Sequence, residues 1–183
     1  MRAFFWMGIV EGKPKLSVVA PASWRPMLAS DIGDVIAIAA IVHPGYPEDD
    51  AVLAERLMLY RAGCFVLTQN GQVSGYVLSH PWIYGDPPQL NVLLQTLPAD
   101  ADSYYLHDIA LLPQAQGQGA AGAIAARLRD HAQAEGFANL SLCAVNGSVA
   151  FWQGQGFAAA TVPGLDARLK SYGADVQFMA RAL

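Results

Sequence analysis

The feature that most constrains this chain is a glycine-rich turn between two segments of different hydrophobic period. The stretch LLPQAQGQGAAGAIAARL, residues 111–128, carries Gly117, Gly119 and Gly122 in the spacing G-x-G-x-x-G. It follows an apolar run typical of a strand and opens an amphipathic helix. Glycines let the backbone approach a phosphate closely, and the free N–H groups and dipole of a helix N-terminus favour negative charge. The turn therefore predicts a phosphate-binding site within a β-loop-α unit.

One ligand for such a turn is a nicotinamide dinucleotide. A dinucleotide-binding fold places an acidic residue about 20 positions after the glycines, at the end of the next strand. Here that strand ends in Ala144, Val145 and Asn146, none of which is acidic. Residues 113–116 also separate the first strand from the first glycine. The sequence therefore disfavours a nicotinamide oxidoreductase.

Composition narrows the class of protein. A chain of 183 residues with 54% hydrophobic and 14% charged residues has the size of one domain. The net charge of −4 and the pI near 5.4 argue against a nucleic-acid partner, which requires clustered Lys and Arg. The apolar run at residues 3–10 is too short to span a bilayer and lacks a small-residue cleavage site. We therefore expect a cytoplasmic protein without a membrane partner.

The two cysteines do not suggest a disulfide framework or a metal site. Cys64 and Cys143 each lie inside an apolar run typical of a strand. A buried free thiol is the simplest interpretation of such a position. We expect no bound metal.

Hydrophobic period and turn signals divide the chain into one domain, residues 24–183. Residues 1–23 show no clear period, and a leader strand, a frayed arm and an upstream extension of the start site all remain open. Asn70-Gly71 is the strongest hairpin signal, and the long connection at residues 81–102 is expected to contain a short helix around 90–97. The remaining expected elements are helices at 30–43, 46–63, 117–136 and 148–155 and strands at 25–28, 103–112, 139–145, 157–162 and 175–183.

Two linked motifs carry a family resemblance. Read one position earlier, residues 116–121 spell Gln-Gly-Gln-Gly-Ala-Ala, which fits the pattern Q/R-x-x-G-x-G/A after a strand and a proline. The next strand is followed by VNGSVAFWQGQGF, with Asn146, then Trp152 four residues before Gly156-Phe157. Together they resemble the coenzyme A loop and the following helix of the GCN5-related N-acetyltransferases. The resemblance is sharp over residues 103–157 and extends, by element order, over 24–183.

The resemblance implies an α/β (α+β) fold: a mixed sheet of six or seven strands flanked by helices and splayed between two central parallel strands, residues 104–112 and 139–145. It implies acetyl-CoA as the acyl donor, with the pantetheine arm in the gap and paired with the backbone of Ala110 and Leu111. Asn146 would hydrogen-bond near the cofactor or cap the short helix, and Trp152 would lie beside the thiol. The residues expected to hold the diphosphate through backbone N–H groups are Gln116, Gly117, Gln118, Gly119, Ala120 and Ala121.

Acetyl transfer to an amine requires a base, because an amine with a pKa near 10 is almost fully protonated at neutral pH. His107 and Asp108 occupy the strand position where relatives often carry an acidic residue. Strand alternation predicts that at most one of them faces the acceptor. The structural alternatives are that His107 is a packed polar residue and that Asp108 caps a loop or a helix. Three other histidines, His43, His80 and His131, are interpreted as structural or exposed.

Other residues remain open between functional and structural roles. Trp82 and Tyr84 either rim the acceptor site or pin the long connection. Cys143 is disfavoured as an acetyl carrier because its neighbours supply no basic partner. Two departures from the family pattern affect the chemistry: Gln116 stands where many relatives have arginine, and Trp152 stands where a tyrosine is usual.

The resemblance predicts an enzyme, an acetyl-CoA-dependent N-acetyltransferase that works by direct transfer in a ternary complex. Its acceptor would be a primary amine, either on a small molecule or at a peptide N-terminus. The alternative is a non-catalytic sensor that keeps the fold and binds acyl-CoA. A homodimer is left open.

Overall fold

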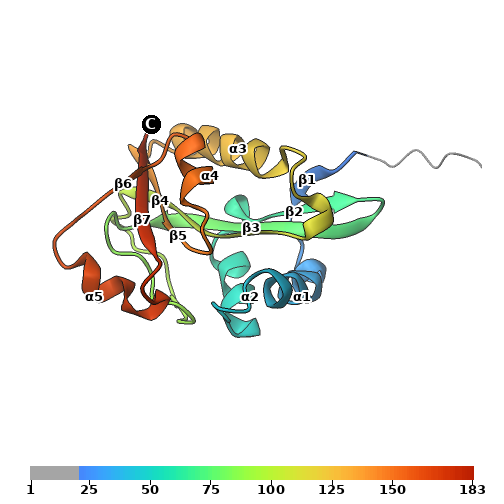
Figure 1. Ribbon diagram of the computed structural model, residues 1–183, viewed down its shortest axis with the longest axis horizontal. Coiled ribbons are helices and arrows are strands. Elements are labelled where there is room, and N and C mark those ends of the chain that lie inside the picture. The colour runs from blue at the N-terminus through green and yellow to red at the C-terminus, as the bar shows by residue number, and fades with distance from the viewer. Residues whose placement is uncertain (1–20) are drawn as a thin grey trace, which may run out of the picture.

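A seven-stranded mixed sheet organises residues 21–183, the part of the chain that the computed structural model describes (Figure 1). The strand order is β1-β2-β3-β4-β5-β7-β6, and the only parallel neighbours within this part of the chain are β4 and β5. This confirms the expected fold class. The strands are β1 (Ser23–Pro26), β2 (Phe65–Gln69), β3 (Gln72–Trp82), β4 (Ser103–Leu111), β5 (Asn139–Ala144), β6 (Ala158–Ala159) and β7 (Gln177–Ala182).

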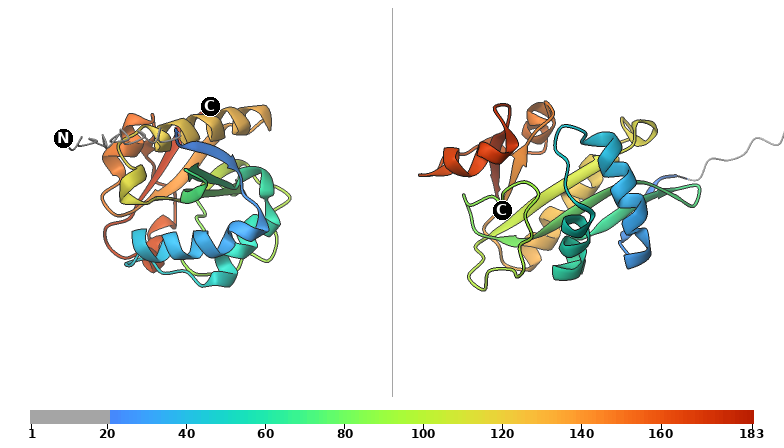
Figure 2. Two further views of the ribbon diagram at one scale, coloured as in Figure 1. Left: turned by 90° about the vertical axis from the view of Figure 1, so that its right-hand side faces the viewer. Right: turned by 90° about the horizontal axis from the view of Figure 1, so that it is seen from below.

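Helices cover both faces of the sheet, with α1 and α2 on one side and α3 and α4 on the other (Figures 1 and 2). The α-helices are α1 (Ile32–Val42), α2 (Asp50–Leu59), α3 (Ala120–Ala134), α4 (Val149–Gly154) and α5 (Leu165–Leu169). Short 3-10 turns lie at η1 (Ala29–Asp31), η2 (Arg61–Gly63), η3 (Pro113–Ala115) and η4 (Lys170–Tyr172). Strand alternation explains the two layers of core, because Tyr76 and Leu78 pack under α1 and α2 while Val77 packs under α3.

The predicted hairpin is confirmed in detail. Asn70 and Gly71 have φ angles of 52° and 80°, and they join β2 to β3. Positive φ at both central residues is the signature of a type I′ turn, which asparagine and glycine adopt most easily. Strand β3 of this antiparallel pair in turn pairs with β4.

The central strands part as the family resemblance implies. Parallel pairing is confined to residues 104–106 of β4 and 140–142 of β5. Beyond that point β4 stays with β3 as far as Leu111, whereas β5 stays with β7 as far as Ala144. A wedge-shaped gap therefore opens between β4 and β5 toward the start of α3.

A β-bulge lies on the wall of this gap. Leu78 pairs with Asp108 and Ser79 pairs with Leu106, so His107 is the extra residue of β4. A bulge breaks the strict alternation of side chains. As a result His107 and Asp108 both line the cavity described below, whereas strict alternation would send them to opposite faces of the sheet. The prediction that at most one of them faces the acceptor stays a prediction.

The connection between β3 and β4 also differs from expectation. Strand β3 continues through Trp82, and no helix forms around residues 90–97. The backbone N–H groups of Leu94 and Gln95 instead donate to the buried carboxylate of Glu55, at 2.8 Å each. Asn91 and Gln95 adopt positive φ angles, which a right-handed helix does not allow.

Three boundaries complete the comparison with the expected elements. Strand β1 begins at Ser23, slightly earlier than the expected strand at 25–28. The turns of α5 and η4, between the closing strands, were not expected from the sequence. The interpretation of residues 1–23 falls mostly on residues 1–20, which lie outside the described part of the chain.

Candidate active site

A cavity of about 680 Å³ lies where β4 and β5 diverge. Its walls come from the α1–α2 loop, β4, the glycine loop with the first turn of α3, the end of β5, and α4. One cavity therefore connects the glycine loop with the polar residues of β4. An elongated ligand has room to lie along the gap between the strands.

The glycine loop has the conformation of an anion site. Gly117 and Gly119 adopt φ angles of 71° and 78°, which favour glycine. The N–H of Ala123 is bonded to the carbonyl of Gly119 at 3.0 Å, so the amides just before it have no partner within the helix. The N–H of Gln116 differs, because it donates to the carbonyl of Pro113 at 3.2 Å. Five of the six residues predicted to bind the diphosphate, 117–121, thus fit that role.

Side chains hold this loop in place. The indole of Trp24 donates to the carbonyl of Ala120 at 2.9 Å. Gln116 folds back and donates to the carbonyl of Leu111 at 2.9 Å, and Gln118 donates to the carbonyl of Gln114 at 2.8 Å. The glutamine that stands where relatives have arginine therefore shapes the loop.

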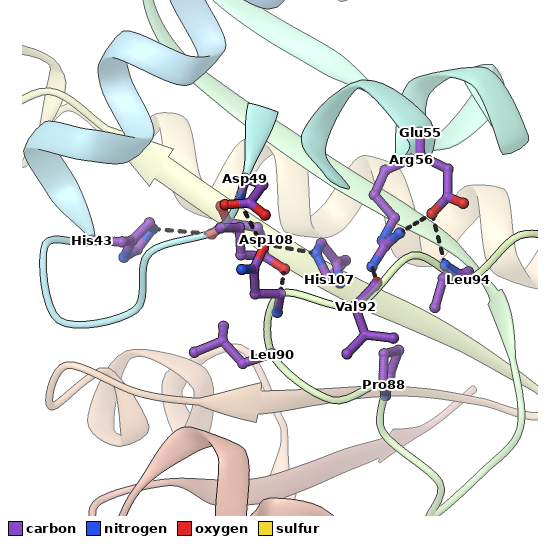
Figure 3. Close-up of polar contacts among 12 residues, drawn as sticks. His43, Asp49, Glu55, Arg56, Pro88, Leu90, Val92, Leu94, His107 and Asp108 are labelled. Carbon is purple, nitrogen blue, oxygen red and sulfur yellow. Dashed lines mark hydrogen bonds and ion pairs between the residues drawn. The ribbon is translucent and has the colours of Figure 1, made fainter. Parts of the chain in front are cut away.

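A cluster of polar side chains also lines the cavity, and Figure 3 shows the contact between His43 and Asp108 within it. Asp108 lies on β4, and its carboxylate forms an ion pair with Nε2 of His43 at 3.0 Å. The hydroxyl of the fully buried Tyr76 donates to the other carboxylate oxygen. Nδ1 of His43 lies 3.0 Å from the side-chain nitrogen of Asn146, which follows β5. These contacts link β3 and β4 to the residues that follow β5.

A parallel pair lies beside it. Nε2 of His107 contacts the carboxylate of Glu48 at 3.1 Å, and the side chain of His107 is only 2% exposed. The other oxygen of Glu48 accepts the backbone N–H of Asn91 at 3.3 Å. Glu48 therefore ties the α1–α2 loop to β4 and to the connection between β3 and β4.

Burial and pairing act in opposite directions on these groups. Burial alone lowers the pKa of His43, but its contact with Asp108 outweighs that effect and leaves the pKa above the ordinary value. Burial alone raises the pKa of Asp108, but His43 and Tyr76 hold it below the ordinary value. The pKa of Glu48 is likewise lowered, because His107 outweighs burial. Both carboxyl groups are therefore ionised at neutral pH.

The chain matches the profile of a known protein family. The profile of the acetyltransferase (GNAT) family matches residues 28–157, which is more than half of the chain. The chain belongs to the GNAT family. No curated protein is a significant match to it.

Solved GNAT structures share the fold at low identity. The GphF GNAT-like decarboxylase in complex with isobutyryl-CoA is 15% identical with a TM-score of 0.74, covering 87% of this chain and 98% of that chain. The ribosomal-protein-S18-alanine N-acetyltransferase from Escherichia coli is 23% identical with a TM-score of 0.61, covering 88% and 94%.

A third solved structure is larger than this chain. The N-acetylglutamate synthase from Neisseria gonorrhoeae, complexed with coenzyme A and N-acetyl-glutamate, is 20% identical with a TM-score of 0.65. The match covers 90% of this chain but only 35% of that protein.

Most of the site residues predicted from sequence line the GNAT cavity. Ala110 and Gln118 are the exceptions: the side chain of Ala110 packs in the core under α1, and Gln118 is exposed. The predicted roles of these residues in binding and catalysis stay predictions. The predicted residues found along the cavity are His107, Asp108, Leu111, Gln116, Gly117, Gly119, Ala120, Ala121, Asn146 and Trp152.

The structure distinguishes between the two interpretations of Trp82 and Tyr84. Trp82 and Tyr84 do not line this cavity and instead pack with Phe178 in a separate cluster of the described chain. The structural interpretation, in which these two side chains hold the long connection in place by packing, is confirmed. The indole of Trp82 donates to the carbonyl of Asp86 at 2.6 Å, which explains the close packing of this turn.

Among the cavity-lining residues that the sequence did not assign to the site, His43 and Glu48 are the ones that contact the predicted catalytic residues. His43 precedes Pro44 and was interpreted as the end of a helix, and Glu48 was one of three acids at the start of the next helix. The sequence feature that could have indicated them is a histidine and an acidic residue in one short loop between two helices. The interpretation of His80 and His131 as structural is confirmed, because His80 is buried and His131 bonds to Tyr60 at 2.8 Å.

Proposed function

We propose that this GNAT protein is an acetyl-CoA-dependent N-acetyltransferase that moves an acetyl group directly to a primary amine in a ternary complex. The observation that carries the proposal is the single cavity, which joins an anion-binding glycine loop to a polar cluster able to handle a proton. Acyl donor and acceptor can thus meet in one cavity.

Acetyl-CoA fits the residues at the loop end. Unpaired amides and positive-φ glycines suit a diphosphate, and the gap between β4 and β5 suits an extended pantetheine arm. Coenzyme A and isobutyryl-CoA are bound to the solved relatives described above. The backbone of Ala110 and Leu111 remains our proposed contact for the arm.

Direct transfer is favoured over an acetyl-cysteine intermediate. Cys143 is the cysteine that lines the cavity, and burial raises the pKa of its thiol to about 11. A thiol with such a pKa contributes almost no thiolate at neutral pH. The acceptor amine must therefore attack the thioester itself.

The charges of the cavity narrow the acceptor. Among the described residues that line it, Glu48 and Asp108 carry charge and no lysine or arginine is present. A carboxylate next to the acceptor amine would face these two acids without a lysine or arginine to pair with. We therefore propose an amine without an adjacent carboxylate, on a small molecule or at a peptide N-terminus, rather than a free amino acid.

Other parts of the proposal concern organisation and location. Residues 24–183 are proposed to form one N-acetyltransferase domain, and a cytoplasmic location stays an expectation. Within residues 21–183, each helix is too short or too polar to span a bilayer. The oligomeric state is open.

An amine panel with detection of the free thiol tests the proposal. The purified chain is given acetyl-CoA and matched pairs of acceptors, such as an amino acid and its amide, or a peptide with a free or blocked N-terminus. We expect thiol release with the amides and free N-termini, together with the acetylated product by mass. Binding of acetyl-CoA without any amide product would instead support the sensor.

A further inference from the structure

Neither His107 nor Asp108, the residues first considered as the general base, has a side-chain atom that is both accessible and unpartnered. His107 is 2% exposed, its Nε2 is taken by Glu48, and its Nδ1 is buried. Asp108 has one carboxylate oxygen against His43 and the other against the hydroxyl of Tyr76. A base must reach the proton that it removes within hydrogen-bond distance, directly or through one water.

We propose that His43, at the end of α1, is the general base of the acetyl transfer and that Asp108 is its positioning residue. This inference rests on the proposed function and assigns a residue that the sequence motifs did not reveal. It depends on three observations: which atom of His43 faces the cavity, what holds the ring, and how the proton leaves the amine.

The contact with Asn146 indicates the tautomer of His43. Nδ1 lies 3.0 Å from the side-chain nitrogen of Asn146, and an amide N–H that donates to Nδ1 requires the lone pair there and leaves the ring proton on Nε2. The carboxylate of Asp108, 3.0 Å from Nε2, then acts as a charge partner of the ring rather than as a hydrogen-bond acceptor. Both His43 and Asn146 line the cavity. This hydrogen bond therefore marks the point where the acceptor amine would replace the side-chain amide of Asn146 as the donor to Nδ1.

Tyr76 and the backbone stiffen the arrangement. Tyr76 is fully buried and holds Asp108 from the side away from the cavity. The backbone N–H of His43 donates to the carbonyl of Ala39 at 2.8 Å, and Pro44 follows directly. The sequence Tyr76–Asp108–His43 thus supplies a buried anion behind an imidazole, the arrangement that stabilises an imidazolium in other acyl-transfer enzymes.

The proposed step balances as follows. His43 Nδ1 takes one proton from the bound ammonium and later releases it to solvent. The freed lone pair of the amine forms the N–C bond with the thioester carbonyl, and the C–S bond of the tetrahedral intermediate then breaks. The nitrogen loses its second proton and coenzyme A leaves with one, so the products are the amide, the free thiol and one proton in solution.

The two charged groups that act on His43 both favour its protonated form. Asp108 comes from β4 and Glu48 from the α1–α2 loop, and both are acids. Asn146, across the gap, is uncharged. We therefore expect the acid limb of kcat/KM to lie above the ordinary histidine pKa of about 6.5.

The test compares His43→Gln, Asp108→Asn and His131→Gln with the intact chain at saturating acetyl-CoA. Glutamine retains an amide donor for Asp108 but has no basic nitrogen. His131→Gln is the matched control, because that histidine contacts Tyr60 away from the cavity. kcat/KM is measured across pH with two acceptors of different basicity. This separates the acid limb of the pH profile that is due to the enzyme's own base, called the enzyme limb below, from the limb that is due to ionisation of the amine. Thermal melts check folding.

We expect His43→Gln to lower kcat/KM by about 10²- to 10⁴-fold and to abolish the enzyme limb, while the control stays near wild type. Asp108→Asn should move that limb to lower pH, which a purely structural role would not do. In parallel, histidine NMR should give a pKa for His43 above the ordinary value that falls in Asp108→Asn, whether or not turnover occurs.

Two results separate failure of this inference from failure of the proposed function. If wild type acetylates amines and a folded His43→Gln keeps its rate and pH profile, His43 is not the base although the function stands. If wild type acetylates no amine in the panel, the proposed function fails and this inference fails with it.

Discussion

The indole nitrogen of Trp24 donates a hydrogen bond to the carbonyl oxygen of Ala120 at 2.9 Å, joining β1 to the first turn of α3. We expect Trp24→Phe to weaken acetyl-CoA binding, because the loop that holds the diphosphate loses an anchor worth about 0.5–1.5 kcal/mol. Calorimetric titration of acetyl-CoA measures the change. Trp82→Phe is the matched control, since that indole donates to the carbonyl of Asp86 away from the cavity. Equal effects of the two variants would contradict a role for Trp24 in the loop.

The glycine loop gives a prediction with its own control. Gly119 and Gly136 have φ angles of 78° and 84°, and a Cβ added at either would meet nothing within 4 Å. Alanine at each position should therefore cost similar backbone strain, roughly 1 kcal/mol. Only Gly119→Ala places a methyl group in the cavity, so its dissociation constant for acetyl-CoA should rise about tenfold, about 1.4 kcal/mol. Thermal melts and acetyl-CoA titrations of both variants decide whether the loss of affinity comes from the methyl group added in the loop or from backbone strain alone.

Trp152 replaces the tyrosine that is usual at this position in the family. An indole N–H does not give up its proton, so Trp152 is expected to act as a wall of the cavity, where it is 4% exposed. Trp152→Phe should lower kcat by less than about tenfold, since it removes at most one hydrogen bond. Trp152→Ala should cost about 3–5 kcal/mol of stability. A loss of kcat beyond about 100-fold in a folded Phe variant would mean that the indole assists the departing thiolate.

A buried ion pair controls the connection between β3 and β4. Glu55 contacts Arg56 at 2.5 Å, and Arg56, whose side chain is 0% exposed, donates to the carbonyl of Val92 at 2.8 Å (Figure 3). Glu55→Gln leaves this guanidinium buried without its carboxylate and should cost about 3–5 kcal/mol. Urea unfolding measures the loss. Asp130→Asn, which breaks a surface pair with Arg129, should cost less than about 1 kcal/mol.

Acid stability should depend on Asp108. Because its pKa is lowered in the folded protein, its stabilising effect is present above the ordinary pKa of about 3.9 and is lost as the pH falls through the folded value. Asp108→Asn should therefore flatten the acid side of the stability curve. Urea midpoints between about pH 3 and 7 test this. The exposed Asp100 supplies the control, and an unchanged slope in Asp108→Asn would argue against a folded-state pKa shift.

Local signals predicted the parts of the fold that local chemistry determines. Asn70-Gly71 gave the hairpin, and glycines 117 and 119 gave the start of α3. The bulge at His107 was not predicted, because alternation was assumed along the whole strand and a bulge depends on pairing with β3. Likewise His43 meets Asp108 only through the tertiary fold. The path of residues 90–97 depends on Glu55 and Arg56, whose charges the sequence placed on an ordinary helix.

The most direct test of the central claim is an initial-rate study in which acetyl-CoA and the best amine of the panel are varied together. Direct transfer within one cavity predicts intersecting double-reciprocal lines, one acetylated amine per thiol released, and no acetyl group on Cys143. Parallel lines with an acetyl-enzyme of matching mass would contradict direct transfer. Acetyl-CoA that raises the melting temperature yet yields no acetylated amine would contradict catalysis and leave the sensor as the better account.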